Sequence, residues 1–190
     1  CLQAAAMACD SAAGVLGREV WTPDEPREAA LALAMSRTGQ WVIPELAGQP
    51  FVEKPPLYYA VGAAFIRVLG DAFGPTAALR IAGILWGLGT LAAVYLLAAR
   101  LLGRTRALAV MCLLATMPGF IQVSHWLIVD QALVCFVAAS LWFLAEAYRA
   151  ERPWALAAAA AAAAGAFLVK GGVGPAVIGL VGSAWSSRCW

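Results

Sequence analysis

Long apolar runs make up most of the chain, and polar residues are confined to one passage and a few short breaks. A helix that spans a bilayer needs about 20 mostly apolar residues. Residues 76–99 satisfy this condition best, and residues 107–123 and 127–145 follow as further spans. Pro118 and Gly119 are expected to kink the second of these near its end, because proline cannot continue a regular helix.

The two ends of the chain are less regular. Residues 2–16 are moderately apolar but short and contain Asp10, so they predict a weak first span. Residues 154–169 are rich in alanine, a strong helix former with a small side chain, and residues 173–185 carry glycines suited to close helix packing. The predicted fold class is all-α: a polytopic membrane protein with five to six transmembrane helices, the last truncated.

The polar passage, residues 21–59, differs from everything around it. Residues 26–37 predict a helix, because Pro26 suits a first turn, Glu28 favours the positive end of the helix dipole, and Gly39 stops the helix. We expect an apolar face on this helix, with the charged residues elsewhere. The apolar face is formed by Ala30, Leu31, Ala34 and Met35, and the charged residues are Arg27, Glu28 and Arg37.

The aromatic residues that follow are of types that favour the headgroup layer, namely Trp41, Phe51, Tyr58 and Tyr59. Residues 21–75 are therefore predicted to form an extracytoplasmic loop that bears interfacial amphipathic helices. The alternative is an ordinary connector with solvated charges.

Composition supports a membrane protein and excludes two other classes. With 63% hydrophobic residues, 13% charged residues and a mean hydropathy of +0.78 over 190 residues, the chain is too apolar for a soluble domain. The net charge of +2 forms no basic stripe, which argues against nucleic acid as a partner. Five cysteines lack metal-ligand spacing and are assigned no chemistry. The chain lacks an initiator Met and stops within an apolar pattern, so we expect a part of a longer protein.

Basic residues predict the orientation. They cluster in two loops, one between the spans 76–99 and 107–123 and one after 127–145. By the positive-inside rule both loops face the cytoplasm. The candidate site then lies on the outer face, where ionisable residues gather along one rim: Asp24, Glu25, Glu53, Lys54, Arg80, Asp130 and Lys170.

Ionisable groups near a membrane are costly, and they often mark a site or a buried pair. Lys54, Arg80 and Lys170 are candidates to hold a phosphate carried on a lipid, while the carboxylates could bind or deprotonate an acceptor hydroxyl. The alternative for Arg80 and Lys170 is that they extend to the headgroups, and for Lys54 it is a salt bridge within the loop to Asp24 or Glu25.

Two further candidates lie near the start of the third span. Asp130 has no long stem with which to reach water, so it needs a cation or a hydrogen-bond donor. We interpret it as a group that supports the acceptor. His125 is a second candidate for that role, although interfacial packing is favoured for a lone histidine in a turn.

The run PDEPREAALALAMSRTGQWVIPELAGQPFVEKPPLYY resembles the first outer loop of the bacterial C-type glycosyltransferases, which include aminoarabinose transferase and the protein O-mannosyltransferases. The shared features are an Asp-Glu pair, an amphipathic helix, a W-(V/I)-x-P-x-L-x-G segment, and a final (F/Y)-x-E-K-P-P. Asp130 and Lys170-Gly171 fit the general layout of the family more loosely. The chain would correspond to the N-terminal part of one such transmembrane domain.

The resemblance implies a polyprenyl-phosphate-linked sugar donor and inverting transfer to a hydroxyl or phosphate acceptor, on a lipid A-like glycolipid, a polysaccharide or a protein. It implies a site on the periplasmic face of a bacterial inner membrane. By position, Asp24 matches the catalytic acid and Glu25 its neighbour. Glu53 and Lys54 match the second motif, associated with donor phosphate or metal, so Glu53 is a candidate metal ligand and a divalent cation a candidate cofactor.

A second hypothesis comes from another class of protein: a transporter fragment, or a non-catalytic membrane protein that binds a lipid headgroup. A transporter is expected to place its ionisable groups near the bilayer midplane. Here they are predicted at one rim, which favours the enzyme.

Overall fold

A computed structural model describes residues 20, 24–149 and 151–186. The part it describes is helical apart from one short antiparallel hairpin, which confirms the all-α class. The helices and strands are α2 (Glu25–Thr38), β1 (Glu45–Leu46), β2 (Gln49–Pro50), α3 (Leu57–Phe73), α4 (Pro75–Leu102), α5 (Arg104–Thr116), α6 (Pro118–His125), α7 (Asp130–Arg149), α8 (Trp154–Lys170) and α9 (Val173–Ser186).

Two of these helices are long and apolar enough to cross a membrane, α4 with 28 residues and α7 with 20. The helices α5 and α6 count as a third span if taken together, with a bend of 65° between them. The expected kink is thus a break: Met117 is extended, as residues before proline prefer, and α6 begins at Pro118. The helices α8 and α9 are apolar but shorter, with 17 and 14 residues. The predicted first span lies outside the described residues.

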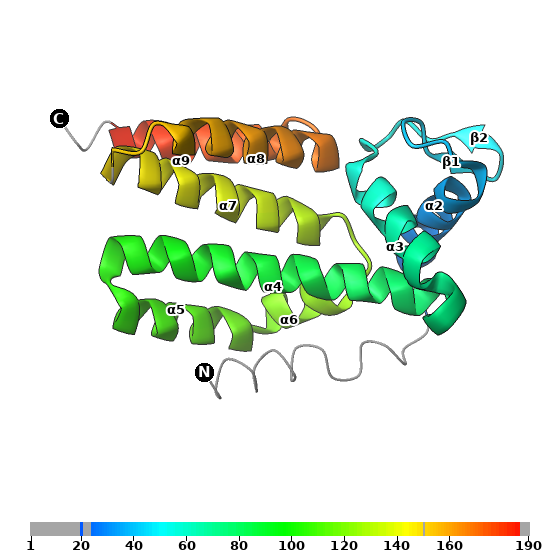
Figure 1. The fold of residues 1–190 in the computed structure, drawn as a ribbon, viewed down its shortest axis with the longest axis horizontal. Helices are drawn as coiled ribbons and strands as arrows, with labels where there is room; N and C mark the ends of the chain where they lie inside the picture. Colours follow the sequence, from blue (N-terminus) through cyan, green and yellow to red (C-terminus); the bar gives the residue numbers. More distant parts are fainter. Residues whose placement is uncertain (1–19, 21–23, 150, 187–190) are drawn as a thin grey trace.

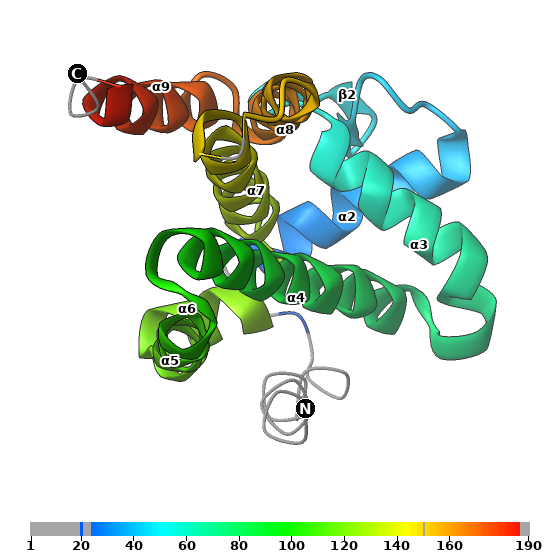
Figure 2. The same ribbon diagram turned by 60° about the vertical axis from the view of Figure 1, so that its left-hand side comes forward.

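The helices form two parts (Figure 1). The helices α4, α5, α7, α8 and α9 run along the longest axis of the molecule, whereas α2, the hairpin and α3 gather at one end, where α4 and α7 begin and α8 ends. We call residues 24–73 the capping layer. Figure 2 shows α3 leading through a tight turn into α4, which fixes the layer to the longest span.

An apolar core joins the capping layer to the helices beneath it. Leu31 of α2 and Tyr59 of α3 are fully buried in one cluster with Val129, at the start of α7, and with Val169, at the end of α8. Burial of such side chains removes apolar surface from water or lipid headgroups and holds the layer in one orientation. The charged residues on α2 and before α3 are thereby fixed against the start of α7 and the end of α8.

The helix predicted over residues 26–37 is confirmed as α2, and Gly39 ends it with φ +74°, a conformation that favours glycine. Its buried face is different from the expected one. Glu28 lies on that face together with Leu31 and Met35, while Ala30 is exposed. Positions 28, 31 and 35 follow the helical period, so the prediction that Glu28 points away from the apolar face was wrong.

Small residues bring the later helices close together, as the sequence suggested. A Cβ atom at Gly165 of α8 would lie 2.6 Å from a ring carbon of Phe136 on α7, and one at Gly174 of α9 would lie 2.5 Å from the Cβ of Ala166. A Cβ at Gly179 would meet no atom within 4 Å, so the expected close approach does not occur there.

Candidate functional site

The deepest ion pair beneath the capping layer joins Glu25 to Arg80. Glu25, the first residue of α2, is 2% exposed, and its carboxylate Oε1 lies 3.7 Å from Nη1 of Arg80. The same oxygen accepts a hydrogen bond of 3.0 Å from the backbone N–H of Leu127, and Arg80 donates one of 3.2 Å to the backbone carbonyl of His125. The pair therefore holds the short link between α6 and α7.

This arrangement changes what is expected of both residues. The Arg80 side chain is 0% exposed, so it does not extend to the headgroups. Arg80 and Glu25 instead satisfy backbone groups at the end of a broken helix, where intrahelical partners are missing. Neither is placed on the open rim with Lys54.

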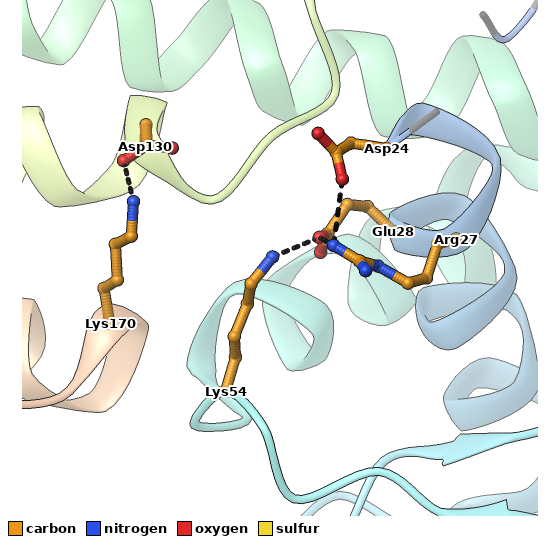
Figure 3. A network of polar contacts seen from close by, with 6 residues as sticks. All are labelled: Asp24, Arg27, Glu28, Lys54, Asp130 and Lys170. Atoms are coloured by element: carbon orange, nitrogen blue, oxygen red, sulfur yellow. Dashed lines mark hydrogen bonds and ion pairs between the residues drawn. The ribbon is translucent and has the colours of Figure 1, made fainter. Parts of the chain in front are cut away.

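A second cluster lies nearer the surface and links four charged side chains in a line (Figure 3). Lys54 Nζ donates a hydrogen bond of 2.6 Å to Oε1 of Glu28, which lies 3.5 Å from Nη2 of Arg27, and that nitrogen is 2.9 Å from Oδ1 of Asp24. Glu28 is the most buried member of the line, with a side chain 1% exposed, whereas the side chains of Lys54, Arg27 and Asp24 are 18%, 33% and 45% exposed.

The alternative for Lys54, a salt bridge within the loop, is what the structure contains, but the partner is neither Asp24 nor Glu25. Because Glu25 and Glu28 are three residues apart on α2, both point inward. Glu25 is already held by Arg80, and Asp24 pairs with Arg27 on the outer side of the first turn. Glu28 is thus the carboxylate that meets Lys54.

Two buried tyrosines at the start of α3, Tyr58 and Tyr59, lie close enough to Glu28 to interact with its charge. Burial, followed by the nearby Glu28 carboxylate, raises the pKa of both Tyr58 and Tyr59 well above the usual value of a phenol, so both remain protonated. The Tyr59 hydroxyl and Oε2 of Glu28 are buried without a hydrogen bond of good geometry. Arg27 lies over the ring of Phe51, 6.0 Å from its centroid, which adds a cation–π contact.

Asp130 and Lys170 form a third pair. Lys170, the last residue of α8, donates a hydrogen bond of 2.5 Å to Oδ1 of Asp130, the first residue of α7 (Figure 3). The expectation that Asp130 needs a cation is confirmed. The two side chains are 34% and 40% exposed, so this pair, like Asp24 and Lys54, can be reached from outside.

Glu53 and His125 take less part in these contacts. Glu53 is exposed in the segment before Lys54, and His125 ends α6, where its carbonyl accepts the bond from Arg80. Over residues 24–149 and 151–186 there is no group of three or more His, Cys, Asp or Glu side chains arranged to hold a metal ion. That Glu53 is a metal ligand therefore stays a prediction, and we assign no step to a divalent cation.

Three residues of the site were missed from the sequence: Glu28, Arg27 and Tyr59. Their charges and aromatic character were visible, but they were placed on a solvated face or in the headgroup layer. The available signal was the spacing of Glu25, Glu28 and Leu31, because residues three apart share one face of a helix.

The arrangement separates buried from accessible charges. Glu25 and Arg80 are enclosed, whereas Lys54, Arg27 and Lys170 are cations that keep partial access to the surface beside the carboxylates of Asp24 and Asp130. Such cations bind anions such as phosphate well, and a half-exposed carboxylate can accept a proton from a hydroxyl.

Residues 53–190, more than half of the chain, match the dolichyl-phosphate-mannose-protein mannosyltransferase family. The chain belongs to this family. Membership confirms the resemblance suggested by the polar passage, and it agrees with a helical polytopic membrane protein.

Curated relatives are similar over much of the chain. An undecaprenyl phosphate-alpha-4-amino-4-deoxy-L-arabinose arabinosyl transferase from Pseudomonas savastanoi pv. phaseolicola is 30% identical over 185 residues, which is 89% of this chain and 32% of that protein. The enzyme of the same name from Edwardsiella ictaluri is 29% identical over 127 residues, 66% of this chain and 22% of that protein. The chain thus spans about a third or less of the length of these relatives.

Solved structures give the same result. ArnT from Cupriavidus metallidurans bound to undecaprenyl phosphate superposes with a TM-score of 0.88 and 27% identity, over 100% of this chain and 36% of that protein. In its apo state it superposes with a TM-score of 0.86 and 28% identity, over 98% of this chain and 35% of that protein.

Proposed function

We propose that the protein to which this chain contributes transfers a sugar from a polyprenyl-phosphate donor to a hydroxyl or phosphate acceptor at the outer face of the membrane. The observation that carries the proposal is the partly exposed line of Asp24, Arg27 and Lys54, in a fold shared with an ArnT that binds undecaprenyl phosphate. The family and the printed names of the relatives support the same reaction class.

We assign the donor phosphate to Lys54, with Lys170 as a second cation. The ammonium group of Lys54 has three N–H donors, and one of them donates to Glu28. The other N–H groups can donate to a phosphate oxygen. Lys170 is bound to Asp130 at the start of α7 and is similarly accessible. Arg80 is enclosed, and we give it, with Glu25, the role of fixing the link between α6 and α7.

The chemistry follows from where charge develops. The acceptor oxygen attacks the anomeric carbon, and the bond from that carbon to the phosphate oxygen breaks with inversion. Asp24 takes up the proton of the acceptor hydroxyl, and the departing lipid phosphate gains negative charge that Lys54 stabilises. Asp130 lies at the start of α7 and His125 at the end of α6. We propose that Asp130 holds Lys170 in place and, with His125, supports the acceptor.

The acceptor, whether a glycolipid, a polysaccharide or a protein, would approach from the periplasmic side of a bacterial inner membrane. The basic residues at the opposite end of the helices support this orientation, since positive charge collects on the cytoplasmic side.

The test is the substitution Asp24→Asn in the full-length protein. It keeps size and hydrogen bonding but removes the charge needed to take up a proton, and a positioned acid or base contributes about 10²–10⁴-fold in rate. We expect a loss of that order in transfer from a radiolabelled lipid-linked sugar. The matched control is Asp71→Asn, because Asp71 is an exposed aspartate at the end of α3, outside the cluster. Near-normal turnover of Asp24→Asn would remove Asp24 from the mechanism.

A further inference from the structure

We propose that Glu28 is a positioning residue, whose buried carboxylate holds the Lys54 ammonium at the rim for a phosphate carried on a lipid. The inference rests on the proposed function, in which Lys54 meets the donor phosphate. It adds a residue that the sequence analysis did not count among the candidates for the site and that the comparisons do not name.

Among the residues that the structure describes, Glu28 is the one side chain to which Lys54 is bonded. Lys54 lies between β2 and α3, in a segment outside the helices and strands, followed by two prolines that restrict the backbone but leave the long side chain free to rotate. Its bond of 2.6 Å to Glu28 joins it to α2, the helix on the other side of the cluster. Pre-organising a flexible cation removes the loss of freedom that binding would otherwise require.

Glu28 is suited to this role because its own position is fixed. Its side chain is 1% exposed and projects from the same face of α2 as the buried Leu31 and Met35. A carboxylate removed from water needs a cation, and Lys54 is the nearest, with Arg27 farther away at 3.5 Å. The position of the Glu28 carboxylate is therefore fixed by the packing of α2, and the Lys54 ammonium takes its position from that carboxylate.

Glu28 also connects the proposed phosphate-binding residue, Lys54, to the pair of Arg27 and Asp24. Lys54 is on one side of it and Arg27, which binds Asp24, is on the other (Figure 3). The four side chains carry two positive and two negative charges. A phosphate bound at Lys54 would thus be coupled through Glu28 and Arg27 to the proposed base.

A carboxylate beside a phosphate site could instead compete with the phosphate for Lys54. The two roles predict opposite signs. If Glu28 positions Lys54, removal of its charge weakens phosphate binding, and if it competes, removal strengthens binding.

The experiment measures binding of undecaprenyl phosphate, and of the uncharged undecaprenol, to the full-length protein in detergent. The variants are Glu28→Gln, Lys54→Met and the two combined. The matched control is Glu146→Gln, because Glu146 is also a poorly exposed glutamate with two cationic neighbours, at the far end of the helices.

We expect Lys54→Met to weaken binding of undecaprenyl phosphate about 10-fold to 100-fold, the range of a charge-assisted contact. Glu28→Gln should weaken it about 3-fold to 10-fold, and the double variant should match Lys54→Met alone, because Glu28 acts through Lys54. Binding of undecaprenol should not change in any variant, whereas a general loss of structure would weaken the binding of both lipids. Glu146→Gln should bind both lipids normally.

Each other result has a definite meaning. If Lys54→Met weakens binding but Glu28→Gln leaves it unchanged or strengthens it, the positioning role is overturned while the function of Lys54 stands. Independent, additive losses in the double variant overturn it as well. If Lys54→Met binds undecaprenyl phosphate normally, the proposed phosphate site itself fails. Should Glu28→Gln fold poorly, Glu28→Asp keeps the charge but withdraws it by one methylene, and normal phosphate binding in that variant overturns the inference.

Discussion

The two ends of the helices carry the same kinds of charged residue in different surroundings. At the end opposite the capping layer, Glu146 of α7 lies 3.1 Å from Arg100 of α4 and 3.5 Å from Arg152, and the two arginines are 34% and 55% exposed. At the capped end, the side chains of Glu25 and Arg80 are 2% and 0% exposed. At the first end the arginines reach the surface, whereas at the capped end both members of an ion pair are enclosed.

The exposed charges bear on the orientation of the helices in the membrane, and the enclosed charges bear on the structure of the candidate site. Exposed arginines need no specific partner, and their number is enough to bias the direction in which a helix inserts. Enclosed charges must be paired, because an unpaired ion away from water is very costly. The number of positive charges in each loop is thus enough to predict the orientation of the helices. The role of the charges at the capped end depends instead on which residues contact one another.

The largest expected effect tests the orientation of the two ends. In the full-length protein with its native cysteines replaced, a cysteine at position 49, now Gln49 in the hairpin, should react with a membrane-impermeant thiol reagent in cells whose outer barrier is permeable. A cysteine at position 105, now Thr105 in α5, should not react. Both residues are exposed, so burial does not distinguish them.

Permeabilising the inner membrane is the control, since both positions should then react. Labelling of position 105 alone in intact cells would reverse the orientation, and the cluster of Asp24 and Lys54 would face the cytoplasm.

The next effect tests the enclosed pair. Glu25→Ala leaves Arg80 without its carboxylate and removes the acceptor of the Leu127 N–H, and the loss of one partner from a buried ion pair costs about 3–5 kcal/mol. We expect a large drop in the free energy of unfolding of the full-length protein, measured by denaturation in detergent. Glu146→Ala, at the opposite end, should cost less, because Arg100 and Arg152 remain hydrated. Equal losses would show that enclosure does not distinguish the two ends.

Much of the fold was predictable from the sequence, because helix length and helix breaks are local properties. The spans over residues 76–99 and 127–145 correspond to α4 and α7, and Pro118 marks the break between α5 and α6. The helix over residues 26–37 and its end at Gly39 were also predicted. Each of these rests on residues close together in the chain.

The site was predicted less well, because it depends on contacts between distant segments. That Asp130 would find a cation followed from its short side chain, but that the cation is Lys170 required the packing of α7 on α8. The pairing of Lys54 with Glu28 joins residues 26 positions apart, and that of Glu25 with the Leu127 N–H joins residues 102 apart. No local pattern fixes such a choice.

The smallest expected effect compares two cations of equal exposure, one at each end. Lys170 and Arg100 are both 34% exposed, and each is bonded to a carboxylate, Asp130 and Glu146 respectively. An ion pair between two partly exposed side chains contributes only about 0–1 kcal/mol, so Lys170→Met should change the free energy of unfolding by no more than that. Arg100→Met should also change it little, because Arg152 still lies beside Glu146. The two variants should differ in binding. Because Lys170 is proposed as a second cation for the donor phosphate, Lys170→Met should weaken binding of undecaprenyl phosphate, while Arg100→Met should bind it as the unmodified protein does. Titration of both variants side by side measures this difference. If Lys170→Met binds normally and both variants unfold normally, the pair of Asp130 and Lys170 is a surface contact like that of Glu146 and Arg100, and the phosphate site is confined to the line of Lys54, Glu28 and Arg27.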